Sequence, residues 1–233
     1  MTKSEVLELL KENKDERGIA HWKRMAEKSG GLKSFGIGLT KLRALAKKIG
    51  RDSQLSAALW KSDVYDARII AILIDDPRQM TRLQAEERVS STGIAMLSHV
   101  FATCDAPLAK TPFAFELACD WMESSDNIRR RCGYGLLYEL SKKNPPGMDD
   151  EFLLERIQII QSQIHDEDMW VREAMNSALF GIGKRNKKLN QAAIKAARTI
   201  GPVDIDYGPD NSCEPLDVVK HLTRPSLHKR FAK

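Results

Sequence analysis

Three segments of the chain align on an arginine, and each has the pattern of a helix start. They are SDVYDARIIAIL (62–73), SDNIRRRCGYGL (125–136) and DEDMWVREAMNSAL (166–179). Each opens with acidic residues that suit a helix N-terminus, carries Arg68, Arg131 or Arg172 six residues later, and continues apolar at helical spacing. The arginines are 63 and 41 residues apart. The second interval fits a repeat of roughly 40–47 residues built from helix pairs, and the first requires an extra helix.

The pattern predicts stacked helix pairs that bury a continuous core and leave a concave face, unless three helix caps align by chance. Apolar residues make up 42% of the chain and aromatics only 6%, which suits helices better than a β-sandwich. Helical periodicity and breaks at Gly, Pro or polar clusters predict helices over 3–13, 15–29, 39–49, 52–61, 63–75, 79–90, 92–103, 112–123, 126–143, 149–163, 168–184 and 188–200. Candidate caps are Ser53, Ser62, Asp126 and the run Asp166 to Asp168.

The third segment, with its spacing D-x-x-V-R-x-x-x-x-x-A-L from Asp168 to Leu179, resembles the helix pattern of HEAT repeats. We therefore expect an all-α, HEAT-like repeat α-solenoid, with one helical domain over 1–200. We expect residues 201–233 to form an irregular C-terminal extension that ends in a basic tail.

The four cysteines, Cys104, Cys119, Cys132 and Cys213, form no C-x-x-C pair and have no histidine at metal-ligand spacing. We therefore expect no zinc site, disulfide framework or other cofactor, and a reducing cytoplasm. The N-terminus lacks the apolar run of a signal peptide, and no segment is long enough to span a membrane. None of the five histidines lies in a recognisable nucleophile motif, which argues against acyl transfer.

The net charge of +5 is unevenly distributed. Residues 1–50 hold 12 Lys/Arg against 6 Asp/Glu, residues 51–165 hold 13 against 17, and residues 166–233 hold 12 against 9. Two basic ends that flank an acidic middle suit a polyanion held at both ends of a curved molecule. Solubility alone is the other explanation of such an asymmetry.

Five short segments resemble the AlkD-like DNA alkylation repair family, a HEAT-like group of bacterial DNA glycosylases. They are FGIGLTKLR (35–43), WKSDVYDAR (60–68), Cys104-Asp105, IRRR (128–131) and WVREAMNSAL (170–179). The resemblance covers most of residues 20–200, and its specificity comes from the order and spacing of motifs that are individually weak. It implies excision of purines alkylated at N3 or N7 from duplex DNA. A carboxylate would stabilise the oxocarbenium-like sugar, aromatic faces would attract the cationic base, and an arginine would keep the carboxylate ionised.

By the same resemblance, the carboxylate falls on Asp105 and the arginine on Arg131. The two tryptophans of the family site fall on Phe101 and Ser177, and a tyrosine of the N-terminal helices falls on Lys28. The charged pair is thus retained while the aromatic part is weakened, so relatives that bind DNA without removing bases remain an alternative.

Other roles compete for these residues. Asp105 precedes Ala-Pro and is also placed to cap the next helix, and Arg131 occupies the repeat position at which an arginine ties neighbouring units together. We expect Arg68 and Arg172, at the same repeat position, to have structural roles. Packing within the core or between repeats is the expected role of Trp60, Trp121 and Trp170.

Two basic clusters are candidates for phosphate contacts: Lys41, Arg43, Lys47 and Lys48 on an N-terminal helix, and Lys184, Arg185, Lys187 and Lys188 at a helix end and the turn that follows. Lysines at a helix C-terminus also favour the helix dipole without any ligand. Together these features predict a monomer that binds double-stranded DNA, alkylated or distorted, without a membrane. The leading function is an alkylpurine DNA glycosylase. The alternatives are a non-catalytic module for distorted or branched DNA and a protein-interaction scaffold.

Overall fold

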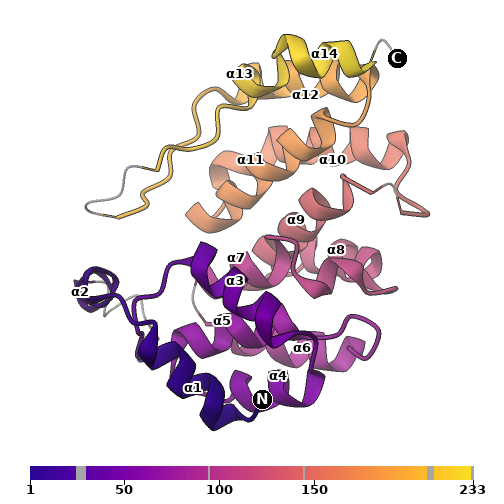
Figure 1. The fold of residues 1–233 in the computed structure, drawn as a ribbon. Coiled ribbons are helices and arrows are strands. Elements are labelled where there is room, and N and C mark those ends of the chain that lie inside the picture. Colours follow the sequence, from indigo (N-terminus) through magenta and orange to yellow (C-terminus); the bar gives the residue numbers. More distant parts are fainter. Residues whose placement is uncertain (25–29, 94, 144, 209–212, 232–233) are drawn as a thin grey trace. The chain divides into compact units, whose positions relative to one another are not determined.

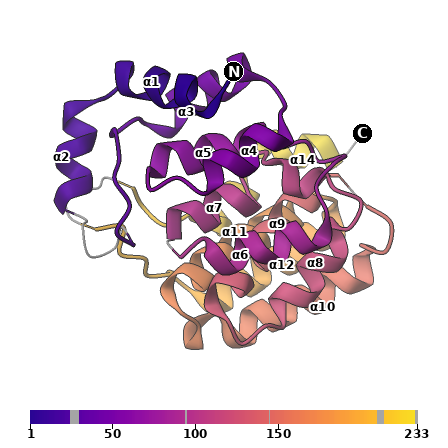
Figure 2. The same ribbon diagram turned by 90° about the horizontal axis from the view of Figure 1, so that it is seen from below.

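The computed structural model describes residues 1–24, 30–93, 95–143, 145–208 and 213–231. In these ranges the chain is helical, and its only extended pairing is an isolated bridge between Lys33 and Val64. Figures 1 and 2 show the helices from two sides. They are α1 (Lys3–Glu12), α2 (Glu16–Arg24), α3 (Leu39–Ile49), α4 (Ser53–Trp60), α5 (Tyr65–Ile74), α6 (Arg82–Ser91), α7 (Ala95–Ala102), α8 (Ala114–Met122), α9 (Asn127–Leu140), α10 (Asp150–Gln163), α11 (Met169–Gly183), α12 (Lys187–Ile200), α13 (Val218–Leu222) and α14 (Pro225–Phe231), with short 3-10 turns η2 (Pro107–Lys110) and η3 (Ile164–Asp166).

The all-α prediction is confirmed, and α1 to α12 follow the twelve expected ranges closely within the described residues. Residues 25–29 of the expected helix 15–29 lie outside the described residues. The agreement extends to the caps of α9 and α11, where Asp126 accepts from the backbone N–H of Arg129 and Asp168 from that of Trp170. Two expected caps are corrected. Asp52, rather than Ser53, caps α4 by accepting from the Leu55 N–H, and α5 has no side-chain cap because its N-cap residue is Val64.

The chain forms two compact units, unit 1 (Met1–Thr111) and unit 2 (Pro112–Lys233). The two units meet in the sequence between η2 and α8. The expected division into a helical domain over 1–200 and a C-terminal extension over 201–233 stays a prediction. The segment expected to be irregular contains α13 and α14, and α13 packs on α11 and α12. Asn176 of α11 helps to hold this extension, because its side-chain amide donates to the Leu216 carbonyl at 2.8 Å.

In unit 1, α3 and α4 pack against α5, most of whose residues are buried. The buried carboxylate of Asp66 in α5 fixes the loop that leads into α3. It accepts hydrogen bonds from the Ser34 hydroxyl (2.8 Å) and from the backbone N–H groups of Phe35 (2.8 Å) and Ile37 (3.0 Å). Because these hydrogen bonds hold the loop before α3, the Asp66 carboxylate fixes the start of α3 and so the position of its cations.

In unit 2, α9 packs between α8 and α11, and α12 packs on both α10 and α11. Close approach of α8 and α9 depends on Gly133, where an added Cβ would lie 2.5 Å from the backbone nitrogen of Met122. Most residues of α9 and α11 are buried, so these two helices form the centre of unit 2.

Candidate functional site

Asp105 lies in a tight turn between α7 and η2. The turn is closed by a hydrogen bond from the Ala106 N–H to the Thr103 carbonyl at 3.0 Å, and both central residues are left-handed, with φ 60° at Cys104 and 58° at Asp105. Of all non-glycine residues that the structure describes, only these two have positive φ. Such a conformation costs about 1–2 kcal/mol for each L-residue outside glycine, and asparagine and aspartate tolerate it best. Strain of this kind is concentrated at functional sites.

Asp105 does not cap the next helical turn. The N-cap residue of η2 is Ala106, which makes no side-chain cap bond, so the structural explanation of Asp105 as a cap is not supported. Its side chain is instead 72% exposed and forms an ion pair with Arg43 of α3, with 3.2 Å between Nη2 and Oδ2. The same guanidinium nitrogen donates to the Cys104 carbonyl at 2.8 Å. Arg43 therefore holds the strained turn and its carboxylate together.

A cavity of about 320 Å³ adjoins this ion pair. Its lining includes three cations and one carboxylate: Arg43, Lys47, Arg51 and Asp105. Arg51 is fixed there because its Nη1 donates to the carbonyl oxygens of Leu73 (2.7 Å) and Asp75 (2.8 Å). The cavity thus combines one exposed carboxylate with an excess of positive charge, which suits a ligand that carries phosphate.

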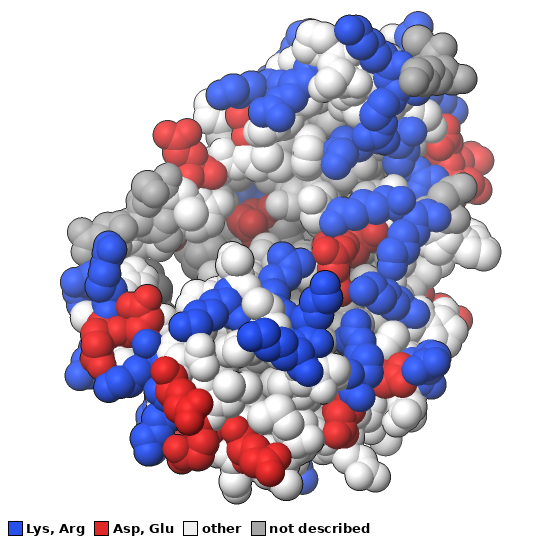
Figure 3. All heavy atoms as spheres, in the orientation of Figure 1, with Lys and Arg blue, Asp and Glu red and all other residues white. Residues whose placement is uncertain are grey.

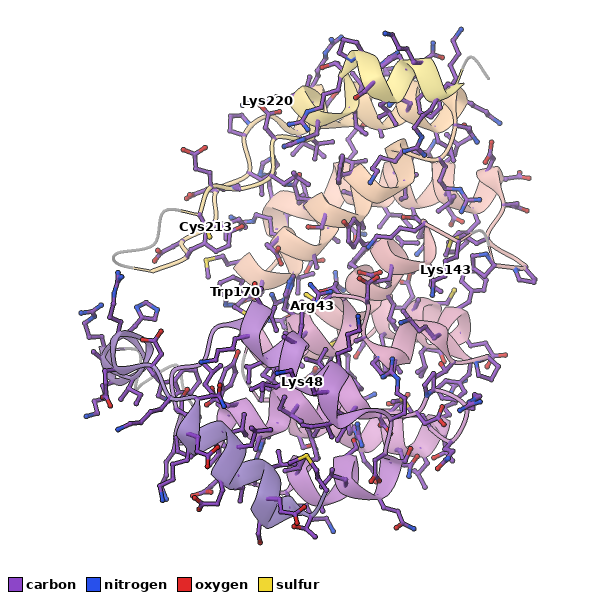
Figure 4. All side chains as sticks on the ribbon, viewed as in Figure 1. Arg43, Lys48, Lys143, Trp170, Cys213 and Lys220 are labelled. Atoms are coloured by element: carbon purple, nitrogen blue, oxygen red, sulfur yellow. The ribbon has the colours of Figure 1, made fainter. Side chains whose placement is uncertain are left out.

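The cations of α3 lie on the surface. Lys41, Arg43, Lys47 and Lys48 are all exposed, and α3 contains no acidic residue. Figure 3 shows Lys and Arg gathered over this helix, and Figure 4 labels Arg43 and Lys48 on it. Lys41 also donates to the Asn13 carbonyl at 3.3 Å, which leaves its charge unneutralised.

Arg131 lies in unit 2 and is buried, with 4% of its surface exposed. Its Nη2 is 3.3 Å from Oε2 of Glu173, and its guanidinium lies over the Trp170 ring at 5.1 Å from the ring centre. Both partners belong to α11, so Arg131 ties α9 to the next helix pair. The structure supports the structural reading of this residue, because a buried guanidinium presents no face to a substrate.

Arg68 and Arg172 have the structural role that we expected. Arg68 Nε donates to the Ser62 carbonyl at 2.8 Å, and Arg172 Nη2 donates to the Glu167 carbonyl at 3.0 Å. Each arginine therefore binds the turn that precedes its own helix. Arg68 also lies over the Trp60 ring, at 5.5 Å from its centre.

The positions that the resemblance assigned to the aromatic side chains of the family site are Phe101, Ser177 and Lys28. Phe101 is 1% exposed, so it presents no face to DNA, and Ser177 is half-buried on α11. Lys28 lies outside the described residues. Trp170, which we assigned to packing, is half-buried beside Arg131, and its ring centre is 6.1 Å from that of Tyr207. The repeat pattern placed Trp170 near an arginine position, but only the fold brings Tyr207 of the C-terminal extension to it.

The second basic cluster lies between α11 and α12. Lys184 and Arg185 are half-buried, whereas Lys187 and Lys188 are exposed. Burial lowers the pKa of the Lys184 ammonium, and the neighbouring charges of Lys142 and Arg230 lower it further. The Lys184 Nζ lies 4.9 Å from the centre of the Phe180 ring, so this lysine sits in a cationic neighbourhood and contacts an aromatic face.

Within the described ranges, no group of three His, Cys, Asp or Glu side chains is arranged to hold a metal ion. None of the four cysteines is part of a disulfide bond. None of the helices in the described part has the length and apolar character needed to cross a bilayer.

Two uncharacterized proteins of Listeria are similar in sequence to this chain. The chain is 22% identical over 195 residues to uncharacterized protein Lin0241 of Listeria innocua, a match that covers 83% of this chain and 84% of that protein. It is 23% identical over 203 residues to uncharacterized protein Lmo0209 of Listeria monocytogenes, with the same shares covered.

Among solved structures, the fold is similar to one described as a new family of proteins related to the HEAT-like repeat DNA glycosylases with affinity for branched DNA structures. The TM-score is 0.82 at 21% identity, over 99% of this chain and 96% of the other, which confirms the HEAT-like repeat fold. The model of the family of DNA alkylation repair enzymes matches residues 6–209, and the chain therefore belongs to that family.

Proposed function

We propose that this protein binds DNA through its sugar-phosphate backbone and prefers branched or distorted DNA to regular duplex. The observation that carries the proposal is α3, a helix with four exposed cations and no acidic residue. Phosphate contacts by Lys and Arg supply most of the affinity of such proteins and release counterions from the DNA. The cluster Lys184, Arg185, Lys187 and Lys188 provides the same chemistry in unit 2.

The preference for branched DNA rests on the structural relative, which is described as having affinity for such structures. This preference also agrees with the lack of accessible aromatic side chains at the described positions that would contact an excised base. Phe101 and Arg131 are buried, and Ser177 has no ring, so three positions that a base-excision site would use offer little to a cationic purine. Backbone recognition requires none of these three side chains.

Binding is tested by fluorescence anisotropy with duplex, abasic and four-way junction DNA over a range of salt concentrations. We expect the junction to bind most tightly, and the logarithm of the affinity to fall linearly with the logarithm of the salt concentration. Equal weak binding to all three DNAs, or binding that does not respond to salt, would contradict the proposal.

A matched pair of variants locates the contact. Lys47→Gln/Lys48→Gln removes two charges from α3, and we expect the salt slope to fall by about 2, since each phosphate contact contributes about 0.9. Lys11→Gln/Lys14→Gln removes the same charge from lysines that already pair with Glu8 and Glu16, and should leave the slope unchanged.

Excision of alkylated purines is a second candidate, favoured by one observation: Asp105 is an exposed carboxylate, held by Arg43 on a strained turn. A fixed carboxylate stabilises the positive charge that develops on the sugar as a glycosidic bond breaks. If the protein is a glycosylase, Asp105→Asn abolishes release of alkylpurines from methylated DNA and retains binding, while Glu12→Gln, a change at an exposed carboxylate of α1, alters neither. Wild-type protein that releases no base would exclude this candidate.

A further inference from the structure

Unit 2 contains a second cavity, of about 490 Å³, that is lined by the end of α9, the α11–α12 turn and α14. We call it the basic pocket. Five of its nine lining residues are cations: Lys142, Lys143, Lys184, Arg185 and Arg230. Figure 4 labels Lys143 among them, and Figure 3 shows Lys and Arg gathered around that position. The lining is completed by Tyr138, Ser141, Gly181 and Asn186.

The pocket exists because α9 and α11 approach closely beneath it. An added Cβ at Gly181 would lie 2.5 Å from the Ser141 hydroxyl oxygen and 2.8 Å from the Tyr138 ring. The two helices end here, at Leu140 and Gly183, and the lysines that follow them line the cavity. Arg185 is held in place by Met148, because its guanidinium contacts the sulfur (3.8 Å) and the carbonyl oxygen (3.5 Å) of that residue.

Negative charge in the pocket is much smaller than positive charge. Lys142 pairs with the buried Glu139, with 2.9 Å between Nζ and Oε2. The C-terminal ends of α9 and α11 each carry a partial charge of about −0.5, so together they offset about one more cation. No acidic side chain of the described residues lines the pocket, so its five cations outnumber the negative charge of Glu139 and the two helix ends.

Lys184 shows the consequence of this excess. Burial lowers the pKa of its ammonium, and repulsion from Lys142 and Arg230 lowers it further. Among the residues that the structure describes, neither Lys184 nor Arg230 forms an ion pair. An anion in the pocket would relieve the repulsion between these groups, whereas a neutral or cationic ligand would not.

We propose that the basic pocket is a binding site for two or more closely spaced phosphate groups of DNA. One phosphodiester carries a single charge, whereas the described lining contains five cations and no acidic side chain. Recognition is of phosphate rather than of a base, because Lys142 Nζ covers the Tyr138 ring at 4.2 Å from its centre and so blocks the face on which a base would stack. This inference rests on the proposed DNA binding and identifies the chemical group that unit 2 contacts.

Closely spaced phosphates have two sources in DNA: internal phosphodiesters where backbones converge at a branch, and a phosphorylated strand end beside its own backbone. The first test compares wild type with Lys143→Gln/Arg230→Gln. Both side chains are exposed, so the fold should tolerate the change. Lys195→Gln/Arg198→Gln removes the same charge from exposed positions of α12 outside the pocket and is the matched control.

We expect the pocket variant to bind junction DNA at least about tenfold more weakly than the control at about 0.1 M salt, with a salt slope lower by about 2. A loss confined to junctions with hydroxyl ends assigns the pocket to converging backbones. A loss confined to duplexes with phosphorylated ends assigns it to strand ends. A pocket variant that binds both DNAs as the control does would overturn the pocket and leave the proposed function standing.

A second measurement does not depend on DNA binding. Pyrophosphate should raise the melting temperature of the wild type more than orthophosphate at equal ionic strength, and the pocket variant should lose this difference while the control keeps it. If wild type binds no DNA, the proposed function fails, and the pyrophosphate shift alone decides whether the pocket binds paired phosphates. No difference between the two anions in wild type would refute the pocket site.

Discussion

Arg43 and Asp105 form an ion pair across 62 positions of sequence, and the same guanidinium binds the carbonyl of Cys104. Both charged side chains are substantially exposed, 44% for Arg43 and 72% for Asp105. Exposed pairs of this kind contribute about 0–1 kcal/mol to stability, so their main consequence is geometric. The pair links the cationic helix α3 to the one turn in the described residues whose non-glycine residues have positive φ, and it brings positive charge and a carboxylate to the same cavity.

Substitution of Arg43 separates its charge from its positioning role. We expect Arg43→Ala to reduce the free energy of unfolding by no more than about 1 kcal/mol in urea denaturation. It should weaken junction binding more than Lys48→Ala, because it also releases the Cys104–Asp105 turn. Arg43→Lys keeps the charge, but an ammonium lacks the planar guanidinium that donates to both the Cys104 carbonyl and Asp105. We therefore expect an intermediate affinity for this variant. Identical losses for Arg43→Ala and Lys48→Ala would mean that Arg43 acts only as a charge.

Arg131 is expected to affect stability rather than binding. Arg131→Met leaves Glu173, which is 17% exposed, without this cation and removes the guanidinium from the Trp170 ring. Because an uncompensated charge in such a site is costly, we expect a loss of about 3 kcal/mol in the free energy of unfolding. Arg198→Met, at an exposed position of α12, should change it by less than about 0.5 kcal/mol. If Arg131→Met unfolds like wild type but fails to bind DNA, Arg131 belongs to the site after all.

The sequence predicted the helices well because their signals are local. Apolar spacing and breaks at Gly and Pro defined α1 to α12, and Asp126 and Asp168 were correctly identified as caps. Ser53 was wrong by a single residue, since Asp52 precedes it and offers an equally suitable acceptor. Which of two adjacent candidates caps a helix depends on their backbone angles, and these cannot be read from the sequence.

The site was less predictable because its contacts are distant in the chain. The family resemblance implied an arginine beside the carboxylate and placed it at Arg131, whereas Asp105 forms its ion pair with Arg43, 62 positions away. Nothing local in the sequence distinguishes Arg43 from the other cations of α3. The basic pocket shows the same limit. Lys184 and Arg185 were predicted as phosphate contacts, whereas Arg230 reaches them only because the C-terminal extension folds back as α14.

Gly133 tests the packing of α8 on α9. A Cβ at this position would lie 2.5 Å from the Met122 nitrogen and 2.8 Å from the Trp121 carbonyl carbon, and backbone atoms cannot rotate away. Alanine gains about 1 kcal/mol in helix propensity, but the helices must move apart, so we expect Gly133→Ala to destabilise by about 1–3 kcal/mol overall. Gly38→Ala has no atom within 4 Å of the new Cβ and should stay within about 1 kcal/mol of wild type. Equal unfolding midpoints in urea for the two variants would refute the close approach.

Asp75 and Arg88 form a buried ion pair in unit 1, with 2.6 Å between Nη1 and Oδ2 and side-chain exposures of 8% for Arg88 and 4% for Asp75. Arg88 Nη2 also donates to the Ser56 hydroxyl at 2.9 Å, and that hydroxyl donates to the Ala71 carbonyl. Burial raises the pKa of Asp75 above its usual value, and the charge of Arg88 opposes the shift. Removal of Arg88 should therefore raise this pKa further.

The pH dependence of unfolding follows from this direction. Because the folded state holds the Asp75 proton where the unfolded chain has lost it, stability falls as pH rises from the usual carboxyl pKa through the raised one. We expect Arg88→Met to cost about 3–5 kcal/mol at neutral pH, since it leaves a buried carboxylate unpaired. The cost should shrink as acid protonates Asp75, and Asp75→Asn/Arg88→Met should abolish that pH dependence. A cost for Arg88→Met that is the same in acid and at neutral pH, measured by urea denaturation, would show that the unpaired Asp75 is not its source.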